Sequence, residues 1–427
     1  MSQLKDMYRT IVADGFPETM TITLGESVLT YHKRTWEMGG EVRGLRYGEN
    51  PDQPAALYEF VEGENTVAGL KWRSPKQGII SALTEEQMLQ AGKHPGKTNM
   101  TDVDNACNIL QYLTRKPAAT ILKHNNPCGA AWADTLYDAL HNAFWCDRIA
   151  AFGGAVVLNS TLDMKCAELI ASQYFEVVAA PAFEEGVLDV IKTRKNLRIM
   201  ELPGLAHLDE ICGIPMLDFK SLTDGGIVIQ KSFVNRITSV DDFIPATGTT
   251  KDGSVFTARK PNAQEAEDLL FAWAVEAGVT SNSVIFARNG ATVAIGTGEQ
   301  DRVGCAELAI HKAYTKYADV LAFNRSGLSL YELQQKALAD ADAAAMLEEI
   351  NRETRENKGG LAGSVVVSDG FFPFRDGVDV VMAQGVTAIA QPGGSIRDWE
   401  VVQACNEKTP QVAMVYTGQR SFKHEKI

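Results

Sequence analysis

Two stretches of this chain, near residues 100–200 and 265–420, alternate short apolar runs with longer helical segments. The apolar runs end in Gly or Asn clusters, a pattern typical of buried strands in α/β proteins. The runs expected to form strands are Ala118–Leu122, Ala155–Leu158, Val177–Ala180, Val284–Ala287, Thr292–Ile295, Ser364–Ser368, Ala388–Gln391 and Val412–Tyr416. The segments expected to form helices are Leu136–Cys146, Gly304–Tyr317 and Ser395–Asn406. This pattern predicts an α/β fold with two similar halves.

The 427 residues are enough for two or three domains of ordinary size. We divide them into an N-terminal extension (1–44), a first α/β unit (45–210), a connection rich in Gly and Pro (211–262) and a second α/β unit (263–427). Within the second unit, residues 328–355 are rich in Ala, Leu, Glu and Gln. They predict an exposed amphipathic helical insertion, with a helix that binds a partner protein as the alternative.

The chain has 41 Lys and Arg residues against 54 Asp and Glu residues, which gives a formal net charge of −13 at pH 7. This balance argues against binding to nucleic acid or to an anionic membrane, but a small anionic ligand needs only a few local cations. The sequence shows no apolar run long enough to span a membrane and no signal peptide pattern. Its seven scattered cysteines include no C-x-x-C pair, which predicts the cytoplasm and no structural zinc site.

The segment Lys123–Ala131 (KHNNPCGAA) follows an expected strand, and we expect it to be a loop at the sheet edge, where α/β proteins bind ligands. His124 is able to accept a proton near neutral pH, and Lys123 is able to stabilise negative charge or protonate a leaving nitrogen. A surface lysine and a capping histidine in an ordinary turn are the alternative.

A second segment, Thr280–Ser283, precedes a hairpin predicted by Asn289–Gly290 and the glycines of Gly296–Gly298. Backbone N–H groups beside glycines are able to approach an anion, and Arg302 at the head of the next helix is a candidate to bind it. Ordinary turn chemistry is the alternative, because a lone G-x-G is a weak signal.

Two more loops suggest a site for a flat heterocycle and an anion. Ser368–Asp376 places three phenylalanines beside acidic residues, which suits an apolar slot with a carboxylate for ring N–H groups. Packing of the three rings into the core is the alternative. Gln391–Asp398 joins a strand to a helix through Gly393 and Gly394, and it predicts either a helix-N-terminal anion site or a plain turn capped by Ser395.

Several catalytic motifs are missing from the sequence. It has no zinc-deaminase pattern, because Pro127–Cys128 lacks a second Cys at the required spacing. It also has no phosphate-binding P-loop and no G-x-S-x-G elbow. From the residues alone, the prediction is a cytosolic α/β enzyme that uses a Lys–His pair on an anionic heterocyclic ligand.

Seven motifs of the sequence, which include the segments above, resemble in this order the transformylase part of the bifunctional AICAR transformylase/IMP cyclohydrolase family. The matching motifs are LRYGENPDQPA from Leu45, KHNNPCGAA from Lys123, AFGGAVVLN from Ala151, TSNSVIFARNG from Thr280, AIGTGEQDRVG from Ala294, SDGFFPFRDGVD from Ser368 and QPGGSIRD from Gln391. They are spread over nearly the whole chain from Leu45 onward. The resemblance therefore favours the functional interpretation of each segment over its local alternative.

The resemblance implies transfer of the formyl group of 10-formyltetrahydrofolate to the 5-amino group of AICAR, which gives FAICAR and tetrahydrofolate. His124 matches the general base, Lys123 the transition-state stabiliser, and Asn282 the amide that orients the reacting groups. The positions that match the AICAR site are Arg46, Tyr47, Gly153, Glu176 and Arg302. Glu176 stands where some members have Asp. The positions that match the folate site are Val303, Phe371, Asp376, Ser395, Ile396 and Arg420.

The family fold implied by the resemblance is a tandem pair of cytidine-deaminase-like α/β/α units without zinc. The family also implies a homodimer whose active sites lie at the subunit interface. Because only 44 residues precede Leu45, we expect a stand-alone transformylase without IMP cyclohydrolase activity. Two alternatives remain: a non-catalytic regulatory paralogue that binds a purine nucleotide or folate, and a transformylase that uses formate and ATP.

Overall fold

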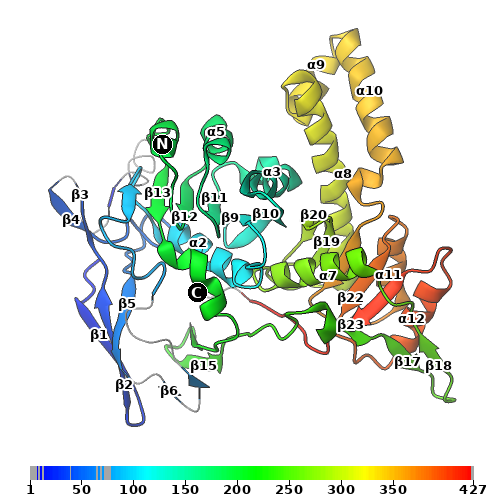
Figure 1. Cartoon of the computed structure of the whole chain (residues 1–427), viewed down its shortest axis with the longest axis horizontal. Helices are drawn as coiled ribbons and strands as arrows, with labels where there is room; N and C mark the ends of the chain where they lie inside the picture. Colours follow the sequence, from blue (N-terminus) through cyan, green and yellow to red (C-terminus); the bar gives the residue numbers. More distant parts are fainter. Residues whose placement is uncertain are drawn as a thin grey trace.

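The centre of the molecule is a mixed sheet of twelve strands (Figure 1). The computed structural model describes residues 7, 10–11, 14–38, 40–63, 66–67, 70–71 and 78–424. In their order across the sheet, the strands are β16 (Ile244–Pro245), β23 (Ala413–Tyr416), β22 (Ala388–Gln391), β21 (Val365–Ser368), β19 (Val284–Arg288), β20 (Ala291–Gly296), β10 (Asn126–Trp132), β9 (Ala118–Lys123), β11 (Ala155–Leu158), β12 (Val177–Ala180), β13 (Arg198–Glu201) and β8 (Met88–Gln90). All eight predicted strands are confirmed to within a residue or two, because each is a short, almost fully buried apolar run.

The sheet contains the same strand pattern twice. In the first half, β9 pairs antiparallel with β10 and β11, and β12 and β13 then follow in parallel. In the second half, β19 pairs antiparallel with β20 and β21, and β22 and β23 follow in parallel. The halves meet where β10 pairs antiparallel with β20, at Ala131 and Ala291. The two halves of the sequence therefore form one continuous sheet.

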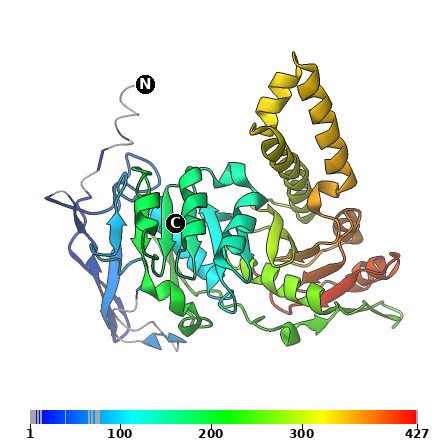
Figure 2. The same ribbon diagram turned by 45° about the horizontal axis from the view of Figure 1, so that its top comes forward.

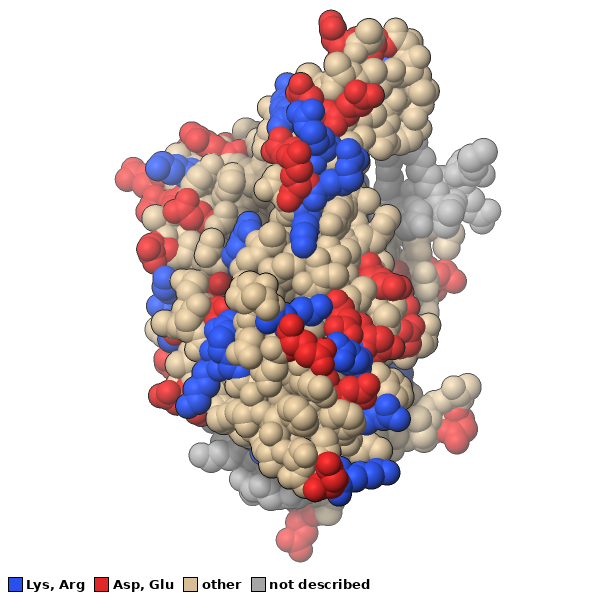
Figure 3. Space-filling model, turned by 90° about the vertical axis from the view of Figure 1, so that its right-hand side faces the viewer, with Lys and Arg blue, Asp and Glu red and all other residues tan. Residues whose placement is uncertain are grey.

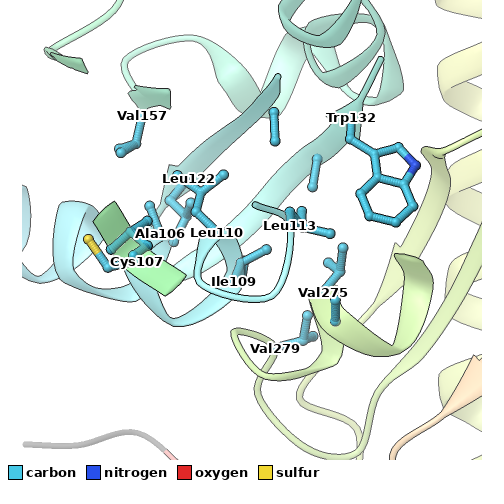
Figure 4. Close-up of a cluster of buried hydrophobic side chains, with 14 of the residues drawn as sticks. Ala106, Cys107, Ile109, Leu110, Leu113, Leu122, Trp132, Val157, Val275 and Val279 are labelled. Carbon is cyan, nitrogen blue, oxygen red and sulfur yellow. The ribbon is translucent and has the colours of Figure 1, made fainter. Parts of the chain in front are cut away.

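Helices cover both faces of the sheet and make three layers. The helices are α2 (Lys97–Leu110), α3 (Leu136–Cys146), α4 (Arg148–Ala151), α5 (Met164–Ser172), α6 (Val187–Ile191), α7 (Ala263–Glu276), α8 (Arg302–Ser326), α9 (Leu330–Ala337), α10 (Ala341–Glu356), α11 (Arg375–Met382) and α12 (Asp398–Asn406), with 3-10 turns η1 (Pro203–Glu210), η2 (Val240–Asp242) and η3 (Lys358–Gly360). Helices α2 and α7 share one apolar core that runs across both halves, part of which is shown in Figure 4. On the other face, α3, α5 and α6 cover the first half, whereas α8, α11 and α12 cover the second.

The predicted helix at Gly304–Tyr317 is the first part of a much longer α8, and the insertion at 328–355 forms α9 and α10. These helices project from the sheet as an arm in both ribbon views (Figures 1 and 2). The arm has a small core of its own, which includes Ala322, Leu333 and Ile350. Acidic and basic side chains lie next to one another along its surface (Figure 3). No helix among the described residues is both long enough and apolar enough to cross a membrane.

Smaller sheets surround the central sheet. They are β1 (Thr19–Leu24), β2 (Ser27–Lys33) and β5 (Tyr58–Gly63); β3 (Trp36–Met38) with β4 (Glu41–Arg43); β6 (Thr66–Val67) with β7 (Leu70–Lys71); β14 (Leu217–Ser221) with β15 (Ile227–Lys231); and β17 (Thr247–Thr249) with β18 (Val255–Thr257). Because β2 pairs with β5, this three-stranded sheet crosses the boundary expected at residue 44. The extension is therefore packed together with the residues that follow it.

The structure corrects two local expectations. The segment after Lys123 is not a loop: the chain turns at His124 and Asn125 and continues as β10 from Asn126. Pro127 and Gly129 suggested a loop, but they lie at a β-bulge inside the strand, where both residues are tolerated. The last helix begins at Asp398 rather than Ser395, and its cap is Arg397. The positive φ angles of Gly393 (72°) and Gly394 (95°) keep the preceding turn out of the helix.

Gly129 is predicted to tolerate no side chain. An added Cβ would lie 2.0 Å from the carbonyl oxygen of Ala143 in α3 and 2.9 Å from the Cβ of Cys146. Gly129→Ala should therefore lower the free energy of unfolding by about 1–3 kcal/mol, as measured by urea denaturation. The control is Gly44→Ala, where the nearest atom is a carboxylate oxygen of Asp14 at 3.1 Å. Equal stability of the two variants would contradict the close packing of β10 on α3.

Candidate active site

The Lys123–His124 pair lies at the tip of the β9–β10 hairpin. His124 (φ 54°) and Asn125 (φ 61°) form the two-residue turn, since Lys123 pairs with Asn126 across it. Positive φ at both central residues defines a type I′ turn. The His124 side chain is exposed, whereas the Lys123 Nζ donates to the carbonyl oxygen of Phe152 at 2.7 Å. The turn therefore presents an imidazole to solvent beside an amine that is held in place.

Beside this turn, a cluster of cations and polar groups surrounds Glu176. Arg198 has a fully buried side chain, and its Nη1 lies 3.3 Å from the Glu176 carboxylate. The Asn99 amide donates to the same carboxylate at 3.3 Å. Burial lowers the pKa of Arg198 while Glu176 acts in the opposite direction. Close by, Gly153 (φ 77°) donates its N–H to the carbonyl of Tyr174, next to Phe175 and Glu176.

Arg46 and Tyr47 form the neighbouring part of this region. The Arg46 Nη2 donates to the Tyr47 hydroxyl at 3.0 Å, and its guanidinium lies 4.5 Å from the centre of the Tyr47 ring. The Nη1 of Arg46 donates to the carbonyl of Lys93. The positive charge of Arg46 acts to lower the pKa of both Tyr174 and Arg198. Arg46, Tyr47, Gly153 and Glu176, which come from distant parts of the sequence, are thus gathered on one side of the hairpin turn.

A second cluster surrounds Asn282, which precedes β19. The Arg302 Nη2 donates to the Asn282 Oδ1 at 2.8 Å, and its Nη1 donates to the carbonyl of Ser283 and to the carboxylate of Asp369. Asp369 is fully buried and also accepts from the Ser281 hydroxyl. Arg302 is therefore paired with a buried carboxylate. The pairing makes Arg302 a donor that fixes the Asn282 amide, and its predicted contact with the nucleotide stays a prediction.

Behind Arg302 lies a second buried carboxyl group. Glu276 is fully buried and accepts from the Ser283 hydroxyl. Burial raises the pKa of Glu276 well above its ordinary value, and the negative charge of Asp369 acts in the same direction. The Ser283 hydroxyl and Arg302 oppose this shift. Burial and the nearby carboxylate of Asp369 therefore both favour the neutral form of Glu276.

A cavity of about 670 Å³ opens next to Asn282 and Arg302. Its lining also includes Gly370, Phe371, Pro373, Pro392, Gly393, Gly394, Gly418, Gln419, Arg420 and Phe422. The Arg420 guanidinium lies 4.7 Å from the centre of the Phe422 ring. The structure thus brings Phe371 and Arg420 together with Asn282 around one hollow.

Four residues predicted for the same pocket lie outside this lining, as far as the described residues go. Val303 is half-buried at the start of α8, and Asp376 is exposed in the first turn of α11, where it accepts from the Gly377 N–H. Ser395 is half-buried and accepts from the Arg397 N–H, and Ile396 is 91% exposed. Of the three phenylalanines, Phe372 packs in the core, whereas Phe371 and Phe374 are exposed.

Direct hydrogen bonds join the hairpin turn to the Asn282 segment. The Asn126 Oδ1 accepts from the Thr280 N–H at 3.0 Å and from the Thr297 hydroxyl at 3.1 Å. The Asn105 amide of α2 donates both to the carbonyl of Asn125 and to that of Gly278. The two clusters come from different halves of the sheet, and these bonds hold them at the β10–β20 junction.

Comparison with known proteins decides the family. A family model described as the AICARFT/IMPCHase bienzyme matches residues 6–312. This chain belongs to that family. It is similar to the bifunctional purine biosynthesis protein PurH of Aquifex aeolicus, with 33% identity over 98% of this chain and 65% of the relative. It is also similar to the protein of the same name from Parvibaculum lavamentivorans, with 37% identity over 94% of this chain and 62% of the relative. The chain therefore spans somewhat less than two thirds of these relatives' length.

The sequence motifs of this AICARFT/IMPCHase family member do not indicate the buried partners of its candidate site residues. Asp369 stands inside a quoted motif but had no assigned role, and Arg198, Asn99 and Asp102 lay outside the motifs altogether. Arg198 alone gave a detectable signal, because it is a charged residue at the start of a buried strand. Among the described residues, no group of three or more His, Cys, Asp and Glu side chains has the arrangement of a metal site.

Asp102 is predicted to make the stability of this family member depend on pH. Burial raises the pKa of Asp102 to about 6, Glu176 acts in the same direction, and the backbone N–H groups of Asn125 and His124 and the charge of Lys97 oppose it. Between about pH 4 and pH 6 the folded chain holds a proton on Asp102 that the unfolded chain has lost. Raising the pH therefore favours unfolding in this window, by about 3 kcal/mol in total.

The Asp102→Asn variant lacks this titration. Urea denaturation of both proteins from pH 4 to pH 8 should show the wild type losing stability relative to the variant as the pH rises, with the loss nearly complete by about pH 7. Parallel curves for the two proteins would contradict the raised pKa.

Proposed function

We propose that this chain transfers the formyl group of 10-formyltetrahydrofolate to the 5-amino group of AICAR, which gives FAICAR and tetrahydrofolate in purine biosynthesis. Membership of the AICARFT/IMPCHase family and the names of the relatives support this proposal. The observation that carries it is the hydrogen-bonded connection between the Lys123–His124 turn and the Thr280–Asn282 segment. This connection joins the two chain segments that carry the proposed base, ammonium group and amide, which supports the proposal.

The proposed reaction forms a bond between the AICAR amino nitrogen and the formyl carbon, and it breaks the bond from that carbon to N10 of the folate. The amine is a weak nucleophile, because its lone pair is delocalised into the imidazole ring and its carboxamide. His124 accepts the proton that the amine loses. Lys123 stabilises the negative charge on the formyl oxygen and protonates the departing N10.

Asn282 positions the reacting groups. Because its Oδ1 accepts from Arg302, its Nδ2 is the group that remains to donate toward the cavity. An N–H donor in this place is able to bind the formyl oxygen or the carboxamide oxygen of AICAR. Arg302, which we predicted to bind the nucleotide directly, acts in this proposal through the orientation of Asn282.

We assign the AICAR end of the site to the cluster of Arg46, Tyr47, Gly153 and Glu176. Arg46 suits the phosphate, and the Glu176 carboxylate suits ribose hydroxyl groups. The cavity lined by Phe371 and Arg420 suits the folate, since an aromatic ring and a cation face an apolar heterocycle with an acidic tail. Val303, Asp376, Ser395 and Ile396 remain predicted contacts at the outer part of this site.

We also propose that two copies of the chain assemble and complete each other's sites. The exposed apolar residues of β15, Ile227, Val228 and Ile229, support an interface, since large exposed apolar side chains in a row are uncommon on monomers. The repeated strand order supports the expected pair of cytidine-deaminase-like units. Sedimentation equilibrium tests the dimer.

The function is tested by mixing the purified protein with AICAR and 10-formyltetrahydrofolate and following the formation of tetrahydrofolate. Turnover supports the transformylase, whereas tight binding of either substrate without turnover supports the regulatory alternative. A parallel reaction with formate and ATP in place of the folate tests the third possibility. Analysis of the products for IMP measures whether ring closure accompanies the transfer.

A further inference from the structure

The two halves of the sheet contain the same hairpin, and each hairpin turn is held by an aspartate. In the first half the turn is His124–Asn125, and in the second it is Asn289–Gly290, where the φ angles of 53° and 72° are also positive. Each turn follows a helix of 14 residues, α2 or α7, and the sixth residue of each helix is a buried aspartate. These residues are Asp102 and Asp268.

Both aspartates accept hydrogen bonds from the backbone of their turn. The Asp102 Oδ1 accepts from the Asn125 N–H at 2.6 Å. The two carboxylate oxygens of Asp268 accept from the N–H groups of Asn289 and Gly290, at 3.0 and 2.8 Å. The aspartate is therefore a repeated structural device for holding a type I′ turn.

The two turns differ in how well their residues tolerate the left-handed backbone, and only the first turn carries a proposed catalytic side chain. Asn289–Gly290 is the sequence that best tolerates a type I′ turn. His124 is not a residue type that favours this turn, so its left-handed backbone costs about 1–2 kcal/mol and requires support from outside. The direction of the His124 Cα–Cβ bond depends on this backbone conformation.

The support around the first turn is also more extensive. At the ninth position of the helix, α2 has Asn105 where α7 has Phe271. The Asn105 amide donates to the carbonyl of Asn125 at 2.8 Å and to that of Gly278 at 2.9 Å. The first turn is thus bound through an N–H by Asp102 and through a carbonyl by Asn105. Its position is fixed relative to the chain that leads to Asn282.

From this difference we propose that Asp102 is a positioning residue for His124, in addition to its structural part in the hairpin. Asp102 acts through the backbone of the turn and sets where the imidazole stands relative to Lys123 and Asn282. This proposal rests on the formyl transfer proposed above, in which His124 is the base.

The matched pair of aspartates provides the experiment. Asp102→Ala and Asp268→Ala each remove the carboxylate from an equivalent turn, so both should lower the melting temperature by a similar amount. Asp102→Ala should also lower kcat by about 10²-fold, with KM values for AICAR and 10-formyltetrahydrofolate close to wild type, because a small displacement of a catalytic group costs rate more than binding. Asp268→Ala should keep a kcat close to wild type. Equal effects of the two substitutions on kcat would overturn the proposal.

Conservative variants separate positioning from folding. Asp102→Asn keeps an oxygen that accepts from Asn125 and should recover most of kcat. Asp102→Glu keeps the charge but moves it by one methylene. It should lower kcat while the protein still folds. The control Asp268→Glu should also fold and should keep a kcat close to wild type. An Asp102→Glu protein with wild-type kcat, or an Asp102→Asn protein as slow as Asp102→Ala, would contradict a positioning role.

A readout without activity distinguishes this proposal from the proposed function. The imidazole signal of His124 in a ¹H–¹⁵N NMR spectrum is assigned by its loss in His124→Ala. It should shift in Asp102→Ala, which removes the acceptor for the Asn125 N–H, and stay unchanged in Asp268→Ala, even if the wild-type protein transfers no formyl group. A His124 signal that responds equally to both substitutions, or to neither, would overturn the positioning role.

Discussion

Replacing His124 with alanine is expected to lower kcat for formyl transfer by about 10²–10⁴-fold, the usual contribution of a positioned general base. The exposed side chain belongs to a turn that is held from α2, so its loss should leave the fold intact. AICAR binding should change little, because Arg46, Tyr47 and Glu176 bind the nucleotide in the proposed site. Steady-state kinetics and calorimetric titration with AICAR measure the two quantities separately.

The control for this variant is His207→Ala. His207 lies on η1 with a side chain that is 66% exposed, next to Glu210. Its replacement should change neither kcat nor binding. Turnover close to wild type in His124→Ala would remove His124 from the mechanism, and loss of AICAR binding in this variant would assign it to the nucleotide site instead.

Replacing Asp369 with alanine should have the largest effect on stability. The substitution leaves the Arg302 guanidinium, which is 8% exposed, without its carboxylate partner inside the protein. Removal of one member of a buried ion pair costs about 3–5 kcal/mol, because the remaining charge stays desolvated. Urea denaturation at neutral pH measures the loss. The Asn282 amide also loses its fixed donor, so kcat should fall together with stability.

Glu353→Ala provides the comparison. Glu353 pairs with Arg325 on the projecting arm, and about a third of each side chain is exposed. Exposed pairs of this kind contribute about 0–1 kcal/mol. If Asp369→Ala loses no more stability than Glu353→Ala, then water or another group satisfies Arg302, and the argument for its positioning role fails.

The sequence predicted the buried strands well, because burial on both faces leaves a continuous apolar run. It failed at β10, where Pro127 and Gly129 resemble loop residues but lie at a bulge. It also could not predict how the halves join. The β10–β20 pairing depends on Ala131 and Ala291, two ordinary residues that are far apart in the sequence. Such a pairing is decided by tertiary packing rather than by local pattern.

For the candidate site, the motifs indicated candidate functional side chains but not the groups that hold them. Lys123, His124 and Asn282 were predicted, and hydrogen bonds bring the segments that carry them together. Asp102 and Asp369 were not, because a buried carboxylate has no local signature in a helix or after a strand. The motifs also did not show that Arg302 pairs with the buried carboxylate of Asp369.

The outermost strands of the central sheet have a consequence for how the chain behaves at high concentration. The edge strands β16 and β8 are two and three residues long, and β16 contains Pro245, which has no N–H to donate. Short edges with a proline offer a poor template for another chain to add a strand, which protects against edge-to-edge aggregation. β10 and β20 are longer strands, and each would be an exposed edge if the two halves of the sheet were separate. Because β10 pairs with β20, neither edge is exposed. Copies of this chain should therefore associate through side-chain surfaces and not by continuing the sheet.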